Sequence, residues 1–486
     1  MSDILAGLNP AQHEAASFID GAILVLAGAG SGKTRVLTRR ISYLIESGVA
    51  PRNILAVTFT NKAATEMKER VEHLVGDEAR DVWISTFHSA CLRMLRRDIG
   101  LLGYSSGFQV YDGDNQKSVI KKIIQERGLS VKEYKPSDYI SKISEAKNHP
   151  KSTEEIAEYL KEEYDPLTVD VFLEYEKRLK QSNAVDFNDL LLLCIRLFEE
   201  NPGLLWRRQN QFRYILVDEY QDTNKAQYKL IQLLGARNQN VMVVGDDDQS
   251  IYRFRGAEVQ NIFYFQEDFD PVHIVRLEQN YRSMGNILEA ANGLISNNTG
   301  RMEKKMWTKA PEGLKLTYLQ AENSWSEADR IGFEIQKLLR LGYKHSDIAI
   351  IYRTNASSLA FEQTFMQNSI PHSLVGARKF YERKEIRDVL SYLRVINNPR
   401  DVESFSRMIQ SPKRGIGAKT LLNLQELARS VNKPIFDVCL EWAQSKKTKQ
   451  AQSMRTILER LQVLRKEGES GVEASDFLDT LLQKSG

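Results

Sequence analysis

The sequence predicts an α/β fold built on a doubly wound parallel sheet. Short apolar runs at 23–26, within 53–60 and within 81–89 are each followed by a turn and then by a helical pattern. Two more such runs lie at 212–217 and 240–245. Continuous apolar strands that alternate with helices are typical of a parallel sheet covered on both faces.

The composition narrows the class of protein. The chain has 486 residues, 42% of them hydrophobic, which is ordinary for a globular protein of about three to four domains. The net charge of +3 neither demands nor excludes a nucleic-acid partner. Three cysteines without zinc or disulfide spacing predict buried thiols in a reducing compartment. We find no signal peptide and no apolar stretch of about 18 residues, so we expect a cytoplasmic protein without membrane contact.

A glycine-rich turn follows the first strand and leads into a helix. Its glycines allow backbone N–H groups to surround phosphate oxygens, and the helix N-terminus adds partial positive charge. Lys33 would reach the β- and γ-phosphates, and Thr34 would ligate Mg²⁺. Position 27 departs from the strict pattern, which has Gly there. The alternative is a turn that binds no ligand, but the Gly-Lys-Thr sequence and the strand and helix beside it disfavour that interpretation. The candidate nucleotide contacts are Ala27, Gly28, Ala29, Gly30, Ser31, Gly32, Lys33, Thr34 and Arg35.

Carboxylates end a later strand. Asp218 and Glu219 follow the run at 212–217, and adjacent carboxylates there are costly unless a cation offsets them. Asp218 would hold Mg²⁺, directly or through water, and Glu219 would orient and deprotonate the attacking water. Gln249, after the run at 240–245, could sense the γ-phosphate.

Hydroxyl and aromatic residues end the second and third strands. Thr58-Phe59-Thr60 and Thr86-Phe87-His88-Ser89 lie where such sheets place their ligands. Exposed Phe beside Lys and Thr suits base stacking with hydrogen bonds to phosphates, whereas a core position is the alternative for each Phe taken singly. Tyr252, Phe254 and Arg255 could likewise face bases or the nucleic-acid backbone.

Three further regions have their own character. Residues 90–183 predict a charged helical insertion, and 276–378 predict a second α/β unit with strands at 314–319 and 347–353. From 379 the chain turns helical and locally basic, and Pro412-Lys413-Arg414-Gly415-Ile416-Gly417 has the form of a hairpin that offers N–H groups to a phosphate. A charged helical surface without that function is the alternative.

The order of these motifs resembles that of superfamily 1A DNA helicases of the UvrD/PcrA/Rep group, from the first residues to near the end of the chain. The resemblance implies a RecA-like P-loop fold with inserted helical subdomains and a partial second RecA-like domain. It divides the chain into motor domain 1A at 1–89 and 184–275, helical insertion 1B at 90–183, partial motor domain 2A at 276–378 and partial insertion 2B at 379–486.

The resemblance also implies residue roles. Gln12 is similar to the glutamine that reads adenine, Tyr281 to the residue that stacks on it, and Arg282 to the arginine finger. The family usually has Trp at position 254 and Phe at position 220, where this chain has Phe254 and Tyr220. The implied DNA contacts are Thr58, Phe59, Thr60, Asn61, Thr86, His88, Phe187, Tyr252, Phe254, Arg255, Arg353, Asn355, Gly415 and Gly417.

The implied activity is Mg²⁺- and ATP-dependent 3′–5′ movement on single-stranded DNA with opening of junctions, alongside repair or replication proteins. Two later family motifs, one carrying a second arginine finger, do not occur in the sequence, so we expect a shortened chain that binds nucleotide but turns over slowly. The alternative is a truncated ATP- and DNA-binding module without unwinding activity. A P-loop kinase is disfavoured because the strand-end motifs around Thr58 and Thr86 would have no role.

Overall fold

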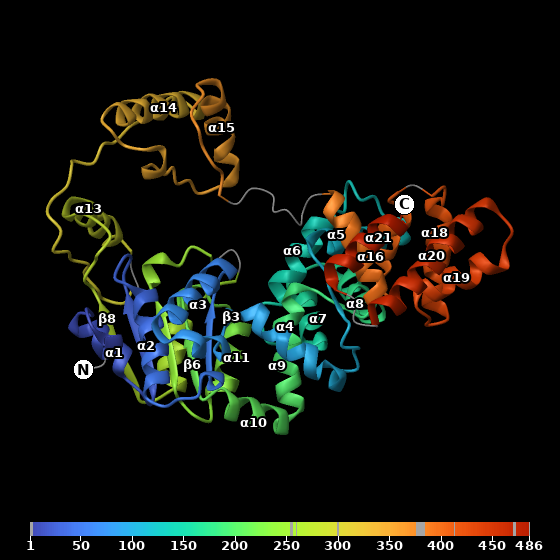
Figure 1. Ribbon diagram of the computed structural model, residues 1–486, viewed down its shortest axis with the longest axis horizontal. Helices are drawn as coiled ribbons and strands as arrows, with labels where there is room; N and C mark the ends of the chain where they lie inside the picture. Colours follow the sequence, from blue (N-terminus) through green and yellow to red (C-terminus); the bar gives the residue numbers. More distant parts are fainter. Residues whose placement is uncertain are drawn as a thin grey trace. The chain divides into compact units, whose positions relative to one another are not determined.

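The computed structural model describes residues 3–252, 256–258, 260–298, 301–375, 384–412, 414–469 and 473–485. Two compact units are present, one formed by residues 1–312 and 388–486 and the other by residues 313–387 (Figure 1). The predicted sheet and most of the candidate site residues lie in the larger unit.

A sheet of six parallel strands forms the centre of the larger unit, in the order β3-β2-β6-β7-β1-β8. A parallel sheet was predicted, but its strand β8 was not. In that order the strands are Trp83–Thr86, Ile54–Thr58, Tyr214–Val217, Val241–Gly245, Ala22–Ala27 and Val272–Leu277. Because the strands are parallel, the residues that follow them meet at one edge of the sheet. Strand β7 lies between β1 and β6, so the segments after these three strands are neighbours.

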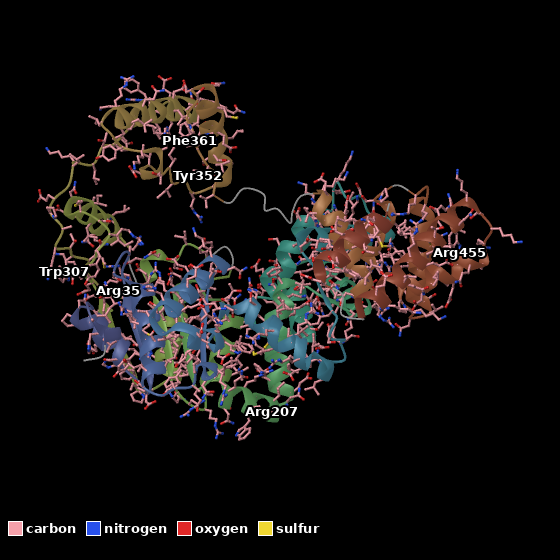
Figure 2. All side chains as sticks on the ribbon, viewed as in Figure 1. Arg35, Arg207, Trp307, Tyr352, Phe361 and Arg455 are labelled. Atoms are coloured by element: carbon pink, nitrogen blue, oxygen red, sulfur yellow. The ribbon has the colours of Figure 1, made fainter. Side chains whose placement is uncertain are left out.

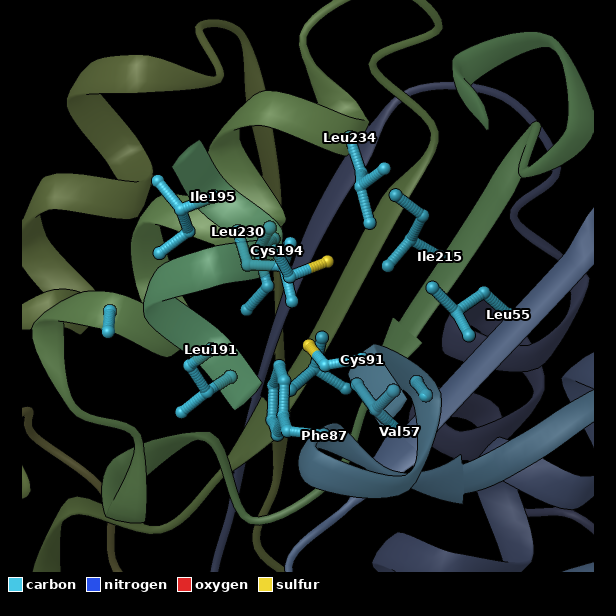
Figure 3. Packing of buried hydrophobic residues seen from close by; sticks show 14 of the residues in the cluster. Leu55, Val57, Phe87, Cys91, Leu191, Cys194, Ile195, Ile215, Leu230 and Leu234 are labelled. Atoms are coloured by element: carbon cyan, nitrogen blue, oxygen red, sulfur yellow. The ribbon is translucent and has the colours of Figure 1, made fainter. Parts of the chain in front are cut away.

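The side chains of β1 alternate between two apolar cores, one on each face of the sheet. Leu24 and Leu26 belong to the first core, part of which Figure 3 shows, while Ile23 and Val25 belong to the second. Burial on both faces explains why the strands are continuously apolar. The first core is closed by α4 (Phe87–Asp98), α9 (Phe187–Glu200), α10 (Pro202–Gln211), α11 (Lys225–Gly235) and α12 (Asn261–Asp268), the second by α1 (Pro10–Ser17), α2 (Lys33–Glu46) and α3 (Asn61–Val75).

The insertion between α4 and α9 is mainly helical, as predicted. It contains α5 (Gly113–Glu126), α6 (Pro136–Ala146), α7 (Thr153–Glu163) and α8 (Pro166–Gln181). A small parallel pair, β4 (Gln109–Val110) with β5 (Ala184–Val185), was not predicted, because two-residue strands leave no periodic signal.

A buried lysine joins this insertion to α9. The Lys147 ammonium lies 2.5 Å from Glu176, 2.9 Å from Asp186 and 2.6 Å from Asp189, and its side chain is 2% exposed. Asp186 caps the N-terminus of α9, whose first residue is Phe187. Burial lowers the pKa of Lys147, but the surrounding carboxylates raise it well above its ordinary value, so the lysine stays charged and holds the start of α9.

The end of the chain is helical, as predicted, with an apolar core of its own. It contains α16 (Lys384–Asn397), α17 (Val402–Gln410), α18 (Ala418–Ser430), α19 (Ile435–Ser445), α20 (Lys449–Glu469) and α21 (Ala474–Ser485). All three cysteines of the chain are buried thiols. Among the described helices, none combines the length and apolar character needed to cross a bilayer.

The smaller unit overturns two predicted strands. Its α14 (Ser324–Arg340) and α15 (Ser358–Gln367) pack around a small apolar core, but 314–319 and 347–353 are not strands. Leu314 is 87% and Ile351 93% exposed. A strand is stabilised by pairing with a neighbour, and the described residues of this unit contain no strand with which either segment could pair.

Candidate active site

The glycine-rich turn has the predicted strand–turn–helix context. Strand β1 ends at Ala27 and helix α2 begins at Lys33. Gly30 and Gly32 adopt φ of 70° and 89°, a left-handed region that side chains other than glycine enter at a cost. The Ser31 hydroxyl donates to the Gly28 carbonyl at 2.8 Å and closes the loop. The Ala27 side chain is buried in the sheet, so only its backbone is in a position to face a phosphate.

The loop lysine meets the predicted carboxylates. Lys33 Nζ lies 2.9 Å from Glu219 Oε2, and the Glu219 backbone N–H donates to Asp218 Oδ1 at 3.0 Å. Glu219 has a left-handed φ of 49°, which turns the chain sharply after β6. The sequence prediction that these three residues share one site is consistent with this geometry.

Burial perturbs the acids of this site. Burial first, and then the Glu219 carboxylate, raise the pKa of Asp218 to about 7, although Lys33 lowers it in part. Burial and Glu219 also raise the pKa of Asp222 to about 6. Such carboxyl groups gain most from a cation that binds beside them, because the cation offsets the cost of their burial as anions.

Two glutamines extend the site to the end of β7. The Gln249 amide donates to Asp246 Oδ2. Gln221, which the sequence analysis did not select, donates to Glu219 Oε2 at 2.8 Å and accepts from the Asp246 N–H at 2.9 Å. In the sequence, only its position three residues after Asp218 pointed to Gln221 as a site residue. A single glutamine does not reveal that its side chain connects the segments that follow β6 and β7.

The residues after β8 approach the loop from the other side. The Tyr281 N–H donates to the Gly30 carbonyl at 2.9 Å, and Asn280 Nδ2 donates to the Ala29 carbonyl at 2.6 Å. Asn9 Nδ2 donates to the Tyr281 hydroxyl at 2.9 Å. Neither Asn9 nor Asn280 was predicted as a site residue.

Gln12, Arg282 and Arg35 lie near the contact between the glycine-rich loop and the residues after β8. The Gln12 amide donates to the Ser31 carbonyl at 2.8 Å, so its side chain contacts the glycine-rich loop. Arg282 is exposed beside Gly30. Arg35, labelled in Figure 2, donates to the Gly7 carbonyl at 3.1 Å, and Thr34 follows Lys33 in the first turn of α2.

An open cleft on the larger unit gathers several predicted DNA contacts. Its lining includes Phe59, His88, Phe187, Ser250 and Tyr264. The rings of His88 and Phe187 lie 5.4 Å apart, and Phe187 is 51% exposed. Burial lowers the pKa of His88 and favours its neutral ring. Flat neutral rings on an open cleft are suited to stack on bases.

Other residues that were predicted to contact DNA take part in packing, helix caps or the sheet of the protein itself. Tyr252 lies 4.9 Å, ring to ring, from Phe59. Thr60 and Thr86 are N-caps, accepting from the N–H groups of Ala63 at 3.1 Å and Ser89 at 3.2 Å. Thr58 is buried at the end of β2, and Asn61 begins α3.

The remaining predicted contacts lie in other segments of the chain or outside the described residues. Phe254 and Arg255 lie outside the described residues. Arg353 and Asn355 belong to the smaller unit, where 355–357 form a short 3-10 helix. Gly415 has a left-handed φ of 71°, and Gly417 precedes the first residue of α18.

The raised pKa of Asp218 leads to a pH-dependent prediction. Unfolded aspartate has a pKa of about 3.9. As pH rises from about 4 to 7, the unfolded chain has lost a proton that folded Asp218 still holds, so this residue makes the fold progressively less stable. Without Mg²⁺ and nucleotide, Asp218→Asn should therefore melt a few degrees above the original chain at about pH 8, and this gain should vanish near pH 4. A gain independent of pH in the melting curves would contradict it.

Comparison with known proteins agrees with this geometry. Residues 8–270 match the UvrD/REP helicase N-terminal domain, and residues 275–469 match the UvrD-like helicase C-terminal domain. The ATP-dependent DNA helicase PcrA of Staphylococcus epidermidis is 47% identical over 490 residues, covering 100% of this chain and 67% of the relative. PcrA of Bacillus subtilis is 49% identical over 429 residues, covering 88% of this chain and 58% of the relative. With a RecA-like sheet, helical insertions and identity of this extent, the protein belongs to the UvrD/REP family of ATP-dependent DNA helicases.

Proposed function

We propose that this chain hydrolyses Mg²⁺-ATP to move 3′ to 5′ along single-stranded DNA and to open duplex at junctions during repair or replication. The observation that carries the proposal is the 2.9 Å contact between Lys33 and Glu219, at the sheet edge onto which the aromatic cleft also opens. The division into two motor domains and two helical insertions, and the direction of movement, rest on the family resemblance.

The nucleotide would lie over the loop at 28–34. Thr34 and Asp218 would hold Mg²⁺, and their hydroxyl and carboxylate oxygens are the donors that this ion prefers. When bound, the ion neutralises charge on the phosphates. The buried Asp218 carboxyl, with its pKa of about 7, fits such a cation site.

The chain's own groups would act around the phosphates. Lys33 would turn from Glu219 to the phosphates, which frees the Glu219 carboxylate to accept a proton from the attacking water. Gln249 would sense the γ-phosphate and Arg282 would stabilise its developing charge. On the base side, Gln12 would read the adenine and Tyr281, 52% exposed, would stack on it.

Glu219→Gln tests the proposed base. The amide keeps the size of the side chain but accepts no proton, so turnover should fall by about 10²- to 10⁴-fold while ATP affinity changes little. Radiolabelled phosphate release with single-stranded DNA present measures the rate, and Glu69→Gln, at an exposed position of α3, is the matched control. Equal turnover of the two variants would remove Glu219 from the chemistry.

Phe187→Ala tests the DNA cleft. Loss of one stacking ring should weaken binding of an oligothymidine by about 1–3 kcal/mol, which fluorescence anisotropy measures as an increase in Kd. Trp206→Ala removes an equally exposed ring (54%) on α10, away from the cleft lining, and should leave Kd unchanged. If both variants bind like the original chain, the cleft is not the DNA path.

Strand displacement tests the activity as a whole. A duplex with a 3′ single-stranded tail should be opened when ATP and Mg²⁺ are present, and one with a 5′ tail should not. Opening of the 5′-tailed duplex alone would reverse the proposed direction. Binding of ATP and DNA without any displacement would instead identify a binding module.

A further inference from the structure

The segment 301–307, which follows α13 (Gly285–Ile295), places a lysine among three aspartates. Lys304 Nζ lies 2.9 Å from Asp246 and 2.8 Å from Asp248, and it also contacts Asp247. The Lys304 side chain is 1% exposed. The carboxylates are close enough together to hold a metal ion, and the lysine ammonium contacts all three of them.

Further contacts complete this group, which we term the Lys304 cage: Arg301, Lys304 and Asp246–Asp248. Arg301 binds Asp248 through Nε at 2.8 Å and Nη2 at 2.5 Å. Burial lowers the pKa of Lys304, but the carboxylates, Asp246 foremost, raise it above its ordinary value. The cations that face the three aspartates of the cage are therefore side chains of the chain itself, Lys304 and Arg301.

The same segment is tied to the residues that carry Arg282. The Trp307 N–H donates to the Glu278 carbonyl at 3.0 Å, and the Asn280 N–H donates to the Trp307 carbonyl at 2.7 Å. Trp307, labelled in Figure 2, thus forms a parallel bridge with Gln279. Segment 301–307 therefore joins the end of β7 to the end of β8 on the sheet edge where the nucleotide is proposed to bind.

Asp246 links the cage to the carboxylates of the site. One of its carboxylate oxygens contacts Lys304 at 2.9 Å, and the other accepts from the Gln249 amide. Its backbone N–H donates to Gln221 at 2.9 Å, and Gln221 donates to Glu219 at 2.8 Å. One continuous set of polar contacts therefore runs from Lys304 to the Glu219 carboxylate.

We propose that Lys304 is a positioning residue for nucleotide hydrolysis and acts through Asp246. By fixing the Asp246 carboxylate it orients Gln249, and by fixing the Asp246 main chain it orients Gln221 and thereby Glu219. The inference rests on the proposed function, in which Gln249 and Glu219 face the γ-phosphate. Among the described residues, Lys304 forms its ion pairs with Asp246, Asp247 and Asp248 and forms no hydrogen bond or ion pair with the loop at 28–34, so its loss should alter turnover more than nucleotide affinity.

Lys304→Met in the full chain tests the proposal. The kcat for ATP with single-stranded DNA should fall by about 10- to 100-fold, by analogy with the loss seen when a residue that orients a metal ligand is removed. The KM for ATP and the Kd for ADP should change less than about threefold. The preference for ATPγS over ADP, measured by displacement of a fluorescent nucleotide, should fall because Gln249 is no longer held. If Lys304 had a purely structural role, Lys304→Met would lower the melting temperature but leave kcat and the preference for ATPγS over ADP unchanged in the folded protein.

Two further variants keep the test decisive. Lys305→Met changes the exposed neighbour and should match the original chain. Should Lys304→Met fail to fold, adding Asp247→Asn removes a carboxylate that faced the lost ammonium, while Asp248 keeps its pair with Arg301. Asp246 still lacks its lysine, so kcat should stay low. An unchanged kcat and an unchanged ATPγS preference in a folded Lys304 variant would overturn the inference. If the original chain neither hydrolyses ATP nor prefers ATPγS, the proposed function itself fails.

Discussion

The ion pair between Lys33 and Glu219 is the contact on which the rest of the site depends. Two adjacent carboxyl groups directly follow the buried strand β6, and burial raises the pKa of Asp218 to about 7. A lysine ammonium 2.9 Å from Glu219 offsets part of that cost. The strand order makes the contact possible, because β1 and β6 flank β7 and all three end at the same edge. A different order would separate the loop from the carboxylates.

Strand β7 lies between β1 and β6, and the residues that follow it connect the two halves of the site. Asp246 at its end holds Gln249 with its carboxylate and Gln221 with its backbone. Lys304 anchors that same carboxylate from a segment far along the chain. Buried polar groups of this kind are costly unless all are satisfied, so the arrangement of the sheet edge is narrowly defined.

The sheet could be predicted because its strands are buried on both faces. Runs such as Ile23–Leu26 are continuously apolar, and each leads into a helix with a polar start. The prediction of strands at 314–319 and 347–353 was wrong, because an apolar run becomes a strand only when another strand pairs with it. Local pattern does not report the presence of that partner.

The sequence by itself determined the glycine loop, the lysine that starts α2 and the carboxylates that follow β6, because each depends on local backbone chemistry. It also indicated aromatic residues at strand ends. Only the tertiary structure decided that Gln221 bridges two strands and that Lys304 neutralises Asp246. Such contacts join residues distant in the chain, and their energy depends on burial and distance, which no local pattern encodes.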